Sequence, residues 1–418
     1  MTKSPLLNES ICIYCDGAGP FSDEHVVCAG LGGDDKRFLL VNVVCARCNT
    51  DVFSPLELEA LRSSPLAIAR SFMQPTGRKR GKRTSPPKLD AQRKLMINKD
   101  GYPYEIDFGQ HSKPIILPQL MVLGEKEVQK TAENIDDLIA FERSLSHLLE
   151  MPTLCCVRKL STDDGLPFEV YTTIRSGNTF TLSGHPERLA TPPADAIWLE
   201  EPMGQDERAP RPLANIFRPQ RGGTVLRLEG MTLETALGFY RLVTQQIALT
   251  NMVESEIVNP LVSVSMTMRV GVMERVIAKV GLNLLAYYLG ADYLRHSAFA
   301  TTKQAILKGS PLLNLVNVDN QQVAAILDCA PVNHHCFVLS AITTPMGEHT
   351  LIMISKLYGL CTLINLGSGM PPADRALPLI VTADYINHKV RLWSLTEFAE
   401  QMHNHFSQAS PTTFRPNF

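Results

Sequence analysis

The stretch "CIYCDGAGPFSDEHVVCAGLGGDDKRFLLVNVVCARCN", residues 12 to 49, carries the strongest structural signal in this sequence. Two C-x-x-C pairs, Cys12 with Cys15 and Cys45 with Cys48, enclose 29 residues. Each such turn directs two sulfurs the same way, so two turns together close a tetrahedral four-thiolate zinc site. The sequence therefore predicts a structural zinc ion that holds together a segment too small to fold around its own core.

Length and composition favour a protein of more than one domain. A chain of 418 residues exceeds a single ordinary core, so two or three domains are expected. The 10 cysteines are too sparse for a disulfide scaffold, and pairs of this kind are typical of metal ligands in a reducing cytosol. The sequence shows neither an apolar run of membrane-spanning length nor a signal peptide, so we expect a cytoplasmic protein without a membrane partner.

The patterns along the chain predict an α+β protein in four segments. Residues 1–76 form the zinc-braced segment, and residues 77–91 form a basic linker that contains prolines. Residues 92–230 are rich in strand patterns, with turn residues between them. Residues 231–418 begin with two strong helices and continue with strands and a terminal helix.

Three local features make these predictions specific. "SPLELEALRSSPLAIARSFM", residues 54–73, has helical spacing, and Pro65 splits it into two short helices, the first capped by Ser54. "DDLIAFERSLSHLLE", residues 136–150, is a helix inserted among strands. Residues 191–213, which are rich in proline and charge, are expected to be a loop.

The residues between the cysteine pairs predict two strands joined by a turn. "SDEHVV" is typical of a strand end, "CAGLGGDDKR" of a turn and "FLLVNVV" of a second strand, and the following knuckle leads into a helix. This order describes a ββα unit braced by zinc. It places an acid and an imidazole, Glu24 and His25, side by side within the metal-binding segment, which suggests a role beyond holding a small fold together.

At these residues the chain resembles the HNH nuclease superfamily, in its zinc-knuckle branch with the ββα-metal fold. The matching parts are "CIYC", "EHVV", "GLGG" and "VVCARCN", followed by the basic "GRKRGKR", and together they cover residues 11–83. The tract "MERVIAKVGLNLLAYYLG", residues 273–290, is also similar to C-terminal regions that accompany such units. The resemblance implies a DNA endonuclease of prokaryotic or phage context, with anti-phage defence as one setting.

The resemblance also implies roles for individual residues. His25 falls at the position of the general base that deprotonates water, while Glu24 and Asn49 fall at the ligands of a catalytic divalent ion. Carboxylate and amide oxygens suit Mg²⁺ or Mn²⁺ better than zinc, so two metals with separate roles are expected. Many members carry an asparagine that orients the base at the position of Leu40, and Asn42 is the nearest substitute here.

A basic arm follows the ββα unit. Five of the six residues in "RKRGKR" are positively charged, namely Arg78, Lys79, Arg80, Lys82 and Arg83. Such a run neutralises phosphates without reading base sequence, so we expect DNA as the partner, with RNA as the alternative. The competing interpretation is a solvated linker, which is the usual role of a charge run.

One C-terminal helix carries an unusual polar stripe. Arg275, Lys279 and Asn283 follow one another at i, i+4 and i+8 on an otherwise apolar helix. A solvated face is the ordinary explanation of such a stripe. The alternative is a buried cationic site for a nucleotide, a phosphate or the DNA backbone.

Three functions remain open from the sequence. The first is a metal-dependent DNA endonuclease whose C-terminal region senses, targets, oligomerises, or binds an activating ligand or partner protein. The second is a zinc-stabilised nucleic-acid-binding or regulatory protein without catalysis, and the third is a scaffold for an interaction module. Glu24, His25 and Asn49 together favour the first, because a binding protein needs no acid–base pair. For His25 alone, the competing interpretation is a histidine that hydrogen-bonds within the knuckle.

Overall fold

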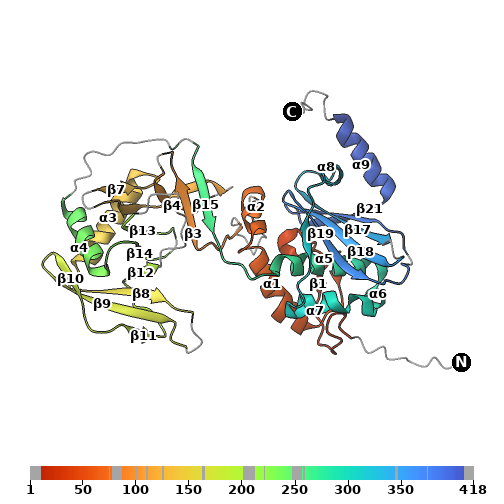
Figure 1. Cartoon of the computed structure of the whole chain (residues 1–418), viewed down its shortest axis with the longest axis horizontal. Coiled ribbons are helices and arrows are strands. Elements are labelled where there is room, and N and C mark those ends of the chain that lie inside the picture. The colour runs from red at the N-terminus through yellow and green to blue at the C-terminus, as the bar shows by residue number, and fades with distance from the viewer. Residues whose placement is uncertain are drawn as a thin grey trace. The chain divides into compact units, whose positions relative to one another are not determined.

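The structure is a computed structural model, and it describes residues 11–74, 76, 77, 87–99, 101–109, 112–124, 127–161, 165–200, 212–220, 222–246, 257, 259–343, 347–373 and 375–408. The chain divides into two compact units. The first unit contains residues 1–90 and 266–418, and the second contains residues 91–265. Both contain helices and sheets, so the expected α+β class is confirmed (Figure 1).

The first unit combines the cysteine segment with the C-terminal part of the chain. Its short antiparallel pair is β1 (Glu24–His25) and β2 (Leu39–Leu40). Its helices are α1 (Ser54–Ala60), α2 (Pro65–Met73), α5 (Val272–Leu289), α6 (Ala291–Leu294), α7 (Ala300–Lys308), α8 (Gln321–Asp328) and α9 (Leu395–Gln408), with single-turn helices at Ala29–Leu31, Cys48–Phe53 and Ser297–Phe299. Its antiparallel sheet has the order β16 (Leu315–Asn317), β19 (Leu360–Ser368), β18 (His349–Leu357), β17 (His334–Thr343), β20 (Leu379–Asp384), β21 (Lys389–Trp393).

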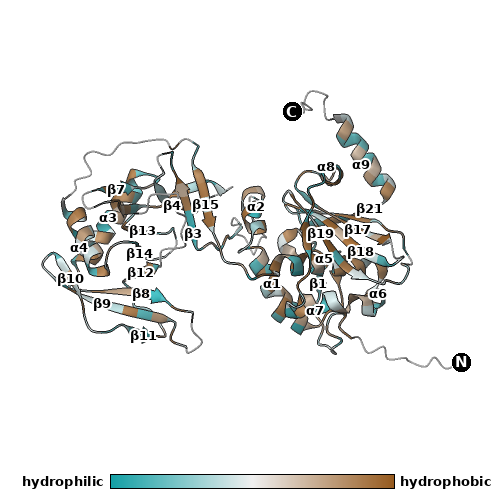
Figure 2. Cartoon of the chain, in the orientation of Figure 1, coloured by the Kyte–Doolittle hydropathy of each residue, from teal (hydrophilic) through white to brown (hydrophobic). Residues whose placement is uncertain are grey.

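One hydrophobic core joins both parts of this unit. It runs from Val26, Leu31 and Phe53 of the N-terminal segment to Leu284 of α5 and Met353 of β18. Every residue of α5 from Val276 to Ala286 is buried. A helix that is apolar on nearly all sides must be covered on all sides. The cysteine segment covers one side of α5, and the sheet, whose strands are largely hydrophobic, covers another (Figures 1 and 2).

This shared core differs from the expected domain boundaries. Residues 1–76 do not form a compact unit of their own, because their apolar side chains are buried against residues 266–418. The expected metal site therefore braces a segment whose apolar side chains are also covered by the C-terminal part of the chain. The boundary expected at residue 231 also differs, since α4 (Leu233–Gln246) belongs to the second unit.

Where the structure describes it, the second unit contains two sheets and two helices. Its larger sheet has nine strands in the order β10 (Thr179–Leu182), β9 (Phe168–Ser176), β8 (Thr153–Lys159), β12 (Ala196–Glu200), β14 (Val225–Leu228), β13 (Ala214–Phe217), β6 (Gln119–Val122), β7 (Val128–Thr131), with β11 (Glu187–Leu189) paired to β9. Its smaller sheet has the order β15 (Leu261–Ser265), β3 (Arg93–Ile97), β4 (Pro103–Phe108), β5 (Pro114–Ile116). Helices α3 (Ile135–Glu150) and α4 pack with the larger sheet around a second core.

The local predictions have mixed outcomes. The two short helices split at Pro65 and the helix at residues 136–150 are confirmed as α1, α2 and α3. The expectation of a loop throughout residues 191–213 is wrong, because β12 lies there between β8 and β14 and is parallel to both. Ser54 does not cap α1, since helical backbone already begins at Cys48, whereas Ser64 caps α2 by accepting from the Leu66 amide at 3.1 Å.

Among the helices described, none is both long and apolar enough to cross a membrane.

Candidate functional site

The four cysteines of the two knuckles lie together. Their sulfurs are within 4.8 Å of one another, with Cys12 and Cys48 at 3.9 Å and Cys15 and Cys45 at 3.6 Å. Zn–S bonds of about 2.3 Å give a sulfur–sulfur edge of about 3.8 Å in a tetrahedron. The cluster can therefore hold one structural metal ion such as zinc.

Hydrogen bonds among these thiols shift their pKa values in opposite directions. The hydrogen bond shared by the Cys12 and Cys48 sulfurs lowers the pKa of Cys12 to about 4 and raises that of Cys48. The backbone amide of Cys45 also donates to the Cys12 sulfur at 3.4 Å. Because metals bind the thiolate, the lowered pKa favours binding at Cys12, whereas the raised pKa of Cys48 opposes it. Within the described residues this is the only cluster of three or more Cys, His, Asp or Glu side chains arranged to bind one ion.

The glycine turn after β1 packs closely on the C-terminal sheet. Gly32 has φ +86°, and a Cβ there would lie 2.7 Å from the backbone oxygen of Asp384 at the end of β20. Only glycine satisfies both the left-handed backbone and this close approach. The "GLGG" sequence is thus explained by packing within the first unit.

His25 lies at the end of β1 with its ring partly exposed. Its Nε2 is 2.7 Å from Oδ1 of Asp35, and the two side chains are 27% and 46% exposed. Asp35 comes from the turn between β1 and β2. The turn was expected from the sequence, but a role for Asp35 was not. The antiparallel register of His25 with Leu39 brings that turn back beside the imidazole.

Glu24 lies in the interior, where it pairs with a lysine from α5. Lys279, which is fully buried, forms ion pairs with both Glu24 and Glu57. Burial raises the pKa of Glu24, although the Lys279 ammonium opposes that shift. Burial also acts to lower the pKa of Lys279, but Glu57 and Glu24 outweigh it and hold that pKa well above its usual value. The ammonium of Lys279 also lies 5.0 Å from the centre of the Phe53 ring.

Asn283, one turn further along α5, continues this network. Its amide nitrogen donates to Oε1 of Glu24 at 3.0 Å and to the backbone oxygen of His25 at 2.9 Å. Its amide oxygen accepts from the Tyr14 hydroxyl at 2.6 Å. The polar stripe of α5 is therefore not a solvated face: Lys279 and Asn283 are fully buried, and the acceptors they meet are protein carboxylates and a carbonyl.

In the described structure, neither of the two asparagines expected at the site bonds to Glu24 or His25. The amide nitrogen of Asn49 donates to Ser22 Oγ at 3.0 Å and to the backbone oxygen of Asp23 at 2.9 Å. Asn42 is exposed, has φ +59° in the turn after β2, and within the described chain makes no hydrogen bond to His25.

The residues expected to hold a catalytic Mg²⁺ or Mn²⁺ do not fit one in this arrangement. A hard divalent ion needs oxygen ligands with open positions for water and substrate. Glu24 is 3% exposed and already has an ammonium and an amide as partners, so its carboxylate does not meet this requirement. Glu24 is thus not open to a hard divalent ion in this arrangement.

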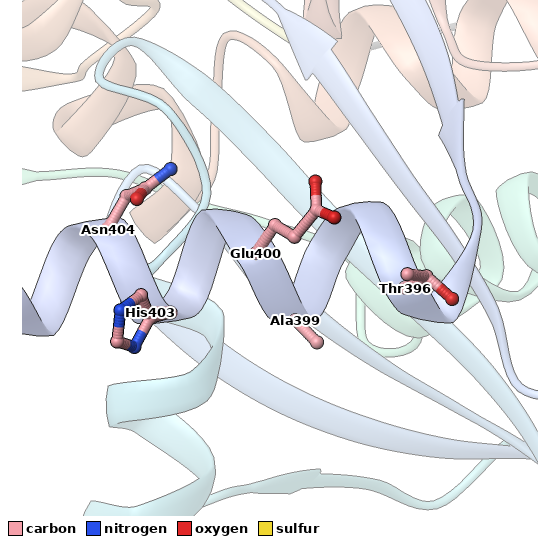
Figure 3. Close-up of a pocket in the computed structure, with 5 residues that line it drawn as sticks. All are labelled: Thr396, Ala399, Glu400, His403 and Asn404. Atoms are coloured by element: carbon pink, nitrogen blue, oxygen red, sulfur yellow. The ribbon is translucent and has the colours of Figure 1, made fainter.

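The basic residues Arg78, Lys79, Arg80, Lys82 and Arg83 lie outside the described residues. On α9, His403 borders a shallow hollow of about 450 Å³ together with Thr396, Ala399, Glu400 and Asn404, all from one helix (Figure 3). In Figure 3 these side chains extend from α9 without converging on a point.

Comparison with known proteins finds no match among family models, curated proteins or solved structures. The function of the chain therefore has to be argued from its own residues.

Sequence reasoning missed the residues that surround His25 and Glu24. Asp35 could have been noticed as an acid in the same turn, and Lys279 and Asn283 were noticed only as a stripe of unknown role. Their separation from Glu24 along the chain, more than 250 residues, gives no local signal of contact.

Proposed function

We propose that the first unit is a nuclease that hydrolyses phosphodiester bonds in DNA, with His25 as the general base. The observation that supports this proposal is the pairing of a partly exposed imidazole with the Asp35 carboxylate at 2.7 Å. A carboxylate that holds an imidazole fixes its tautomer and stabilises the imidazolium that forms when it takes a proton. The competing interpretation, a histidine that hydrogen-bonds within the knuckle, expects the same bond, and the nicking assay below distinguishes the two.

In this proposal the two ring nitrogens have separate tasks. Nε2 is held by Asp35, so Nδ1 is the atom that takes the proton from an attacking water. The four-thiolate centre holds the knuckles on which β1 and the helix after Cys48 depend, and so fixes the base in place. The resemblance to HNH nucleases in residues 11–83 points to phosphodiesters as the substrate class, and the basic arm supports a polyanion.

A catalytic ion bound by Glu24 and Asn49 forms no part of the proposed mechanism, because these residues do not fit one as they are arranged. Glu24 is assigned instead to the buried pair with Lys279.

A second function is favoured by the buried ion pair of Glu24 with Lys279. A nucleic-acid-binding or regulatory protein without catalysis needs the zinc-braced fold but no free carboxylate at the turn. The Glu24 carboxylate is buried and paired with the Lys279 ammonium, which supports this alternative.

A plasmid-nicking assay separates the two functions. The zinc-loaded full chain is incubated with supercoiled DNA without added metal, in Mg²⁺ and in Mn²⁺, beside His25→Ala, Asp35→Asn and the control His403→Ala. We expect nicking by the native chain and the control, none by His25→Ala, and a fall of about 10²-fold or more for Asp35→Asn. Zinc content and circular dichroism should be the same in all four proteins.

Equal nicking by the native chain and His25→Ala would overturn the proposal. DNA binding without nicking in every condition would favour the second function.

A further inference from the structure

Helix α5 holds the β1–β2 unit through three side chains spaced one turn apart. Lys279 pairs with Glu24, and Asn283 donates to the backbone oxygen of His25. Tyr287, the next in the series, donates from its hydroxyl to the backbone oxygen of Arg37 at 3.1 Å. The C-terminal part of the chain therefore contacts the first strand, the base residue and the turn after it.

Each polar atom of the Asn283 side chain is hydrogen-bonded. Both of its amide hydrogens and its amide oxygen have partners, at 3.0, 2.9 and 2.6 Å, and its side chain is fully buried. An amide with donor and acceptor both engaged has one orientation, because rotation by half a turn would bring its oxygen against the acceptor oxygens of Glu24 and His25. Asn283 is thus a rigid link between Tyr14 and the backbone of His25.

Strand β1 needs such a link. It contains two residues, and in the described structure its only sheet neighbour is β2. A strand this short is fixed by few backbone hydrogen bonds. A side chain that holds the carbonyl of His25 therefore contributes much to where the imidazole lies relative to Asp35.

We infer that Asn283 is a positioning residue for His25, oriented in turn by the Tyr14 hydroxyl. Its catalytic consequence rests on the proposed function, but its effect on the imidazole does not. The site is then assembled from two distant parts of the sequence, with the base supplied by the N-terminal segment and its alignment by α5.

Three variants test this inference. Asn283→Ala removes the link itself. Tyr14→Phe removes only the hydroxyl that orients Asn283 and keeps the ring, whose centre is 4.8 Å from that of Phe53. The matched control is Tyr288→Phe, which removes a hydroxyl bond from the same helix to the backbone oxygen of Ala376 at 3.1 Å.

The first measurement is a long-range ¹H–¹⁵N NMR spectrum of histidine-labelled protein, with the His25 signals assigned by their loss in His25→Ala. The native chain and Tyr288→Phe should show His25 in a single tautomer, whereas Tyr14→Phe and Asn283→Ala should show it averaged between two. The second measurement is nicking, where the two test variants should lose about 10²-fold in kcat with little change in KM.

The outcomes are distinct. His25 could keep its native signals in Tyr14→Phe and in the folded part of the Asn283→Ala sample. Asn283 would then only stabilise the fold, and the inference would be overturned. If the His25 signals change but the native chain never nicks DNA, the positioning role stands and the nuclease proposal fails. If the signals change and kcat falls together, both stand.

Discussion

Removal of the buried ammonium of Lys279 gives the sharpest test of how the first unit is held together. In Lys279→Met the side chain keeps nearly the same length and can still fill its space, but Glu24 and Glu57 lose their cation. Glu24 is 3% exposed, so its charge would remain in the interior without compensation. Breaking a buried ion pair by removal of one partner costs about 3–5 kcal/mol. With a urea m value of about 3 kcal/mol/M, the unfolding midpoint should fall by about 1 M or more.

The assay can follow the first unit alone. The chain has 2 tryptophans, and Trp393 lies on β21 of the first unit while Trp198 lies on β12 of the second. In a Trp198→Phe background, the fluorescence of Trp393 reports urea unfolding of the first unit. The control is Arg269→Met, which breaks an ion pair to Glu59 whose arginine is 68% exposed and should cost less than about 1 kcal/mol.

The pH dependence and a double variant complete this test. Burial already raises the pKa of Glu24, so the loss of Lys279 should raise it further. Protonation then removes the unpaired charge, and the deficit of Lys279→Met should shrink as the pH falls toward that raised pKa. Lys279→Met with Glu24→Gln should recover much of the lost stability. The assignment of a structural ion pair would be refuted by either of two results. In the first, the free energy of unfolding of Lys279→Met lies within about 1 kcal/mol of that of the native chain. In the second, the double variant is less stable than Lys279→Met.

Three other predictions follow from the first unit. Cys45→Ala should remove the one bound zinc ion and unfold this unit at lower urea, measured by elemental analysis and Trp393 fluorescence; full zinc retention would contradict the four-thiolate assignment. Gly32→Ala should lower the free energy of unfolding more than the matched Gly359→Ala. Both glycines have positive φ, +86° and +90°, but only a Cβ at position 32 would meet backbone, at Asp384. Equal costs in urea unfolding would contradict the close approach. Burial lowers the pKa of His335 from 6.5 to about 3, so its contribution to stability is complete above pH 6.5 and is lost as the pH falls toward 3. His335→Phe should accordingly show a smaller loss of unfolding free energy over that interval, and parallel pH profiles for the two proteins would count against it.

Much of the local structure could be predicted from the sequence because it depends on neighbouring residues. The C-x-x-C spacing specified the sulfur cluster, and Pro65 divided α1 from α2. The strand β12 escaped prediction, since five residues between prolines and charges give too short a pattern to distinguish from a loop. Its identity as a strand comes from its neighbours β8 and β14.

The candidate site was predicted in part. The sequence singled out Glu24 and His25, and the structure places them on one strand with different surroundings. Successive residues of a strand point to opposite faces, so one was bound to face the interior if the other faced the surface. The expected sharing of an ion by Glu24 and Asn49 took no account of a lysine that arrives from α5.

By itself, the sequence determined the four-thiolate centre, the α+β class and most of the helices, because spacing and periodicity act over a few residues. Only the tertiary structure decided that residues 1–90 and 266–418 form one unit, that Glu24 is paired with Lys279, and that His25 is held between Asp35 and Asn283. The physical reason lies in α5, whose apolar faces must be buried on nearly every side. The segment that covers one of those faces also has to satisfy the polar groups that α5 carries there.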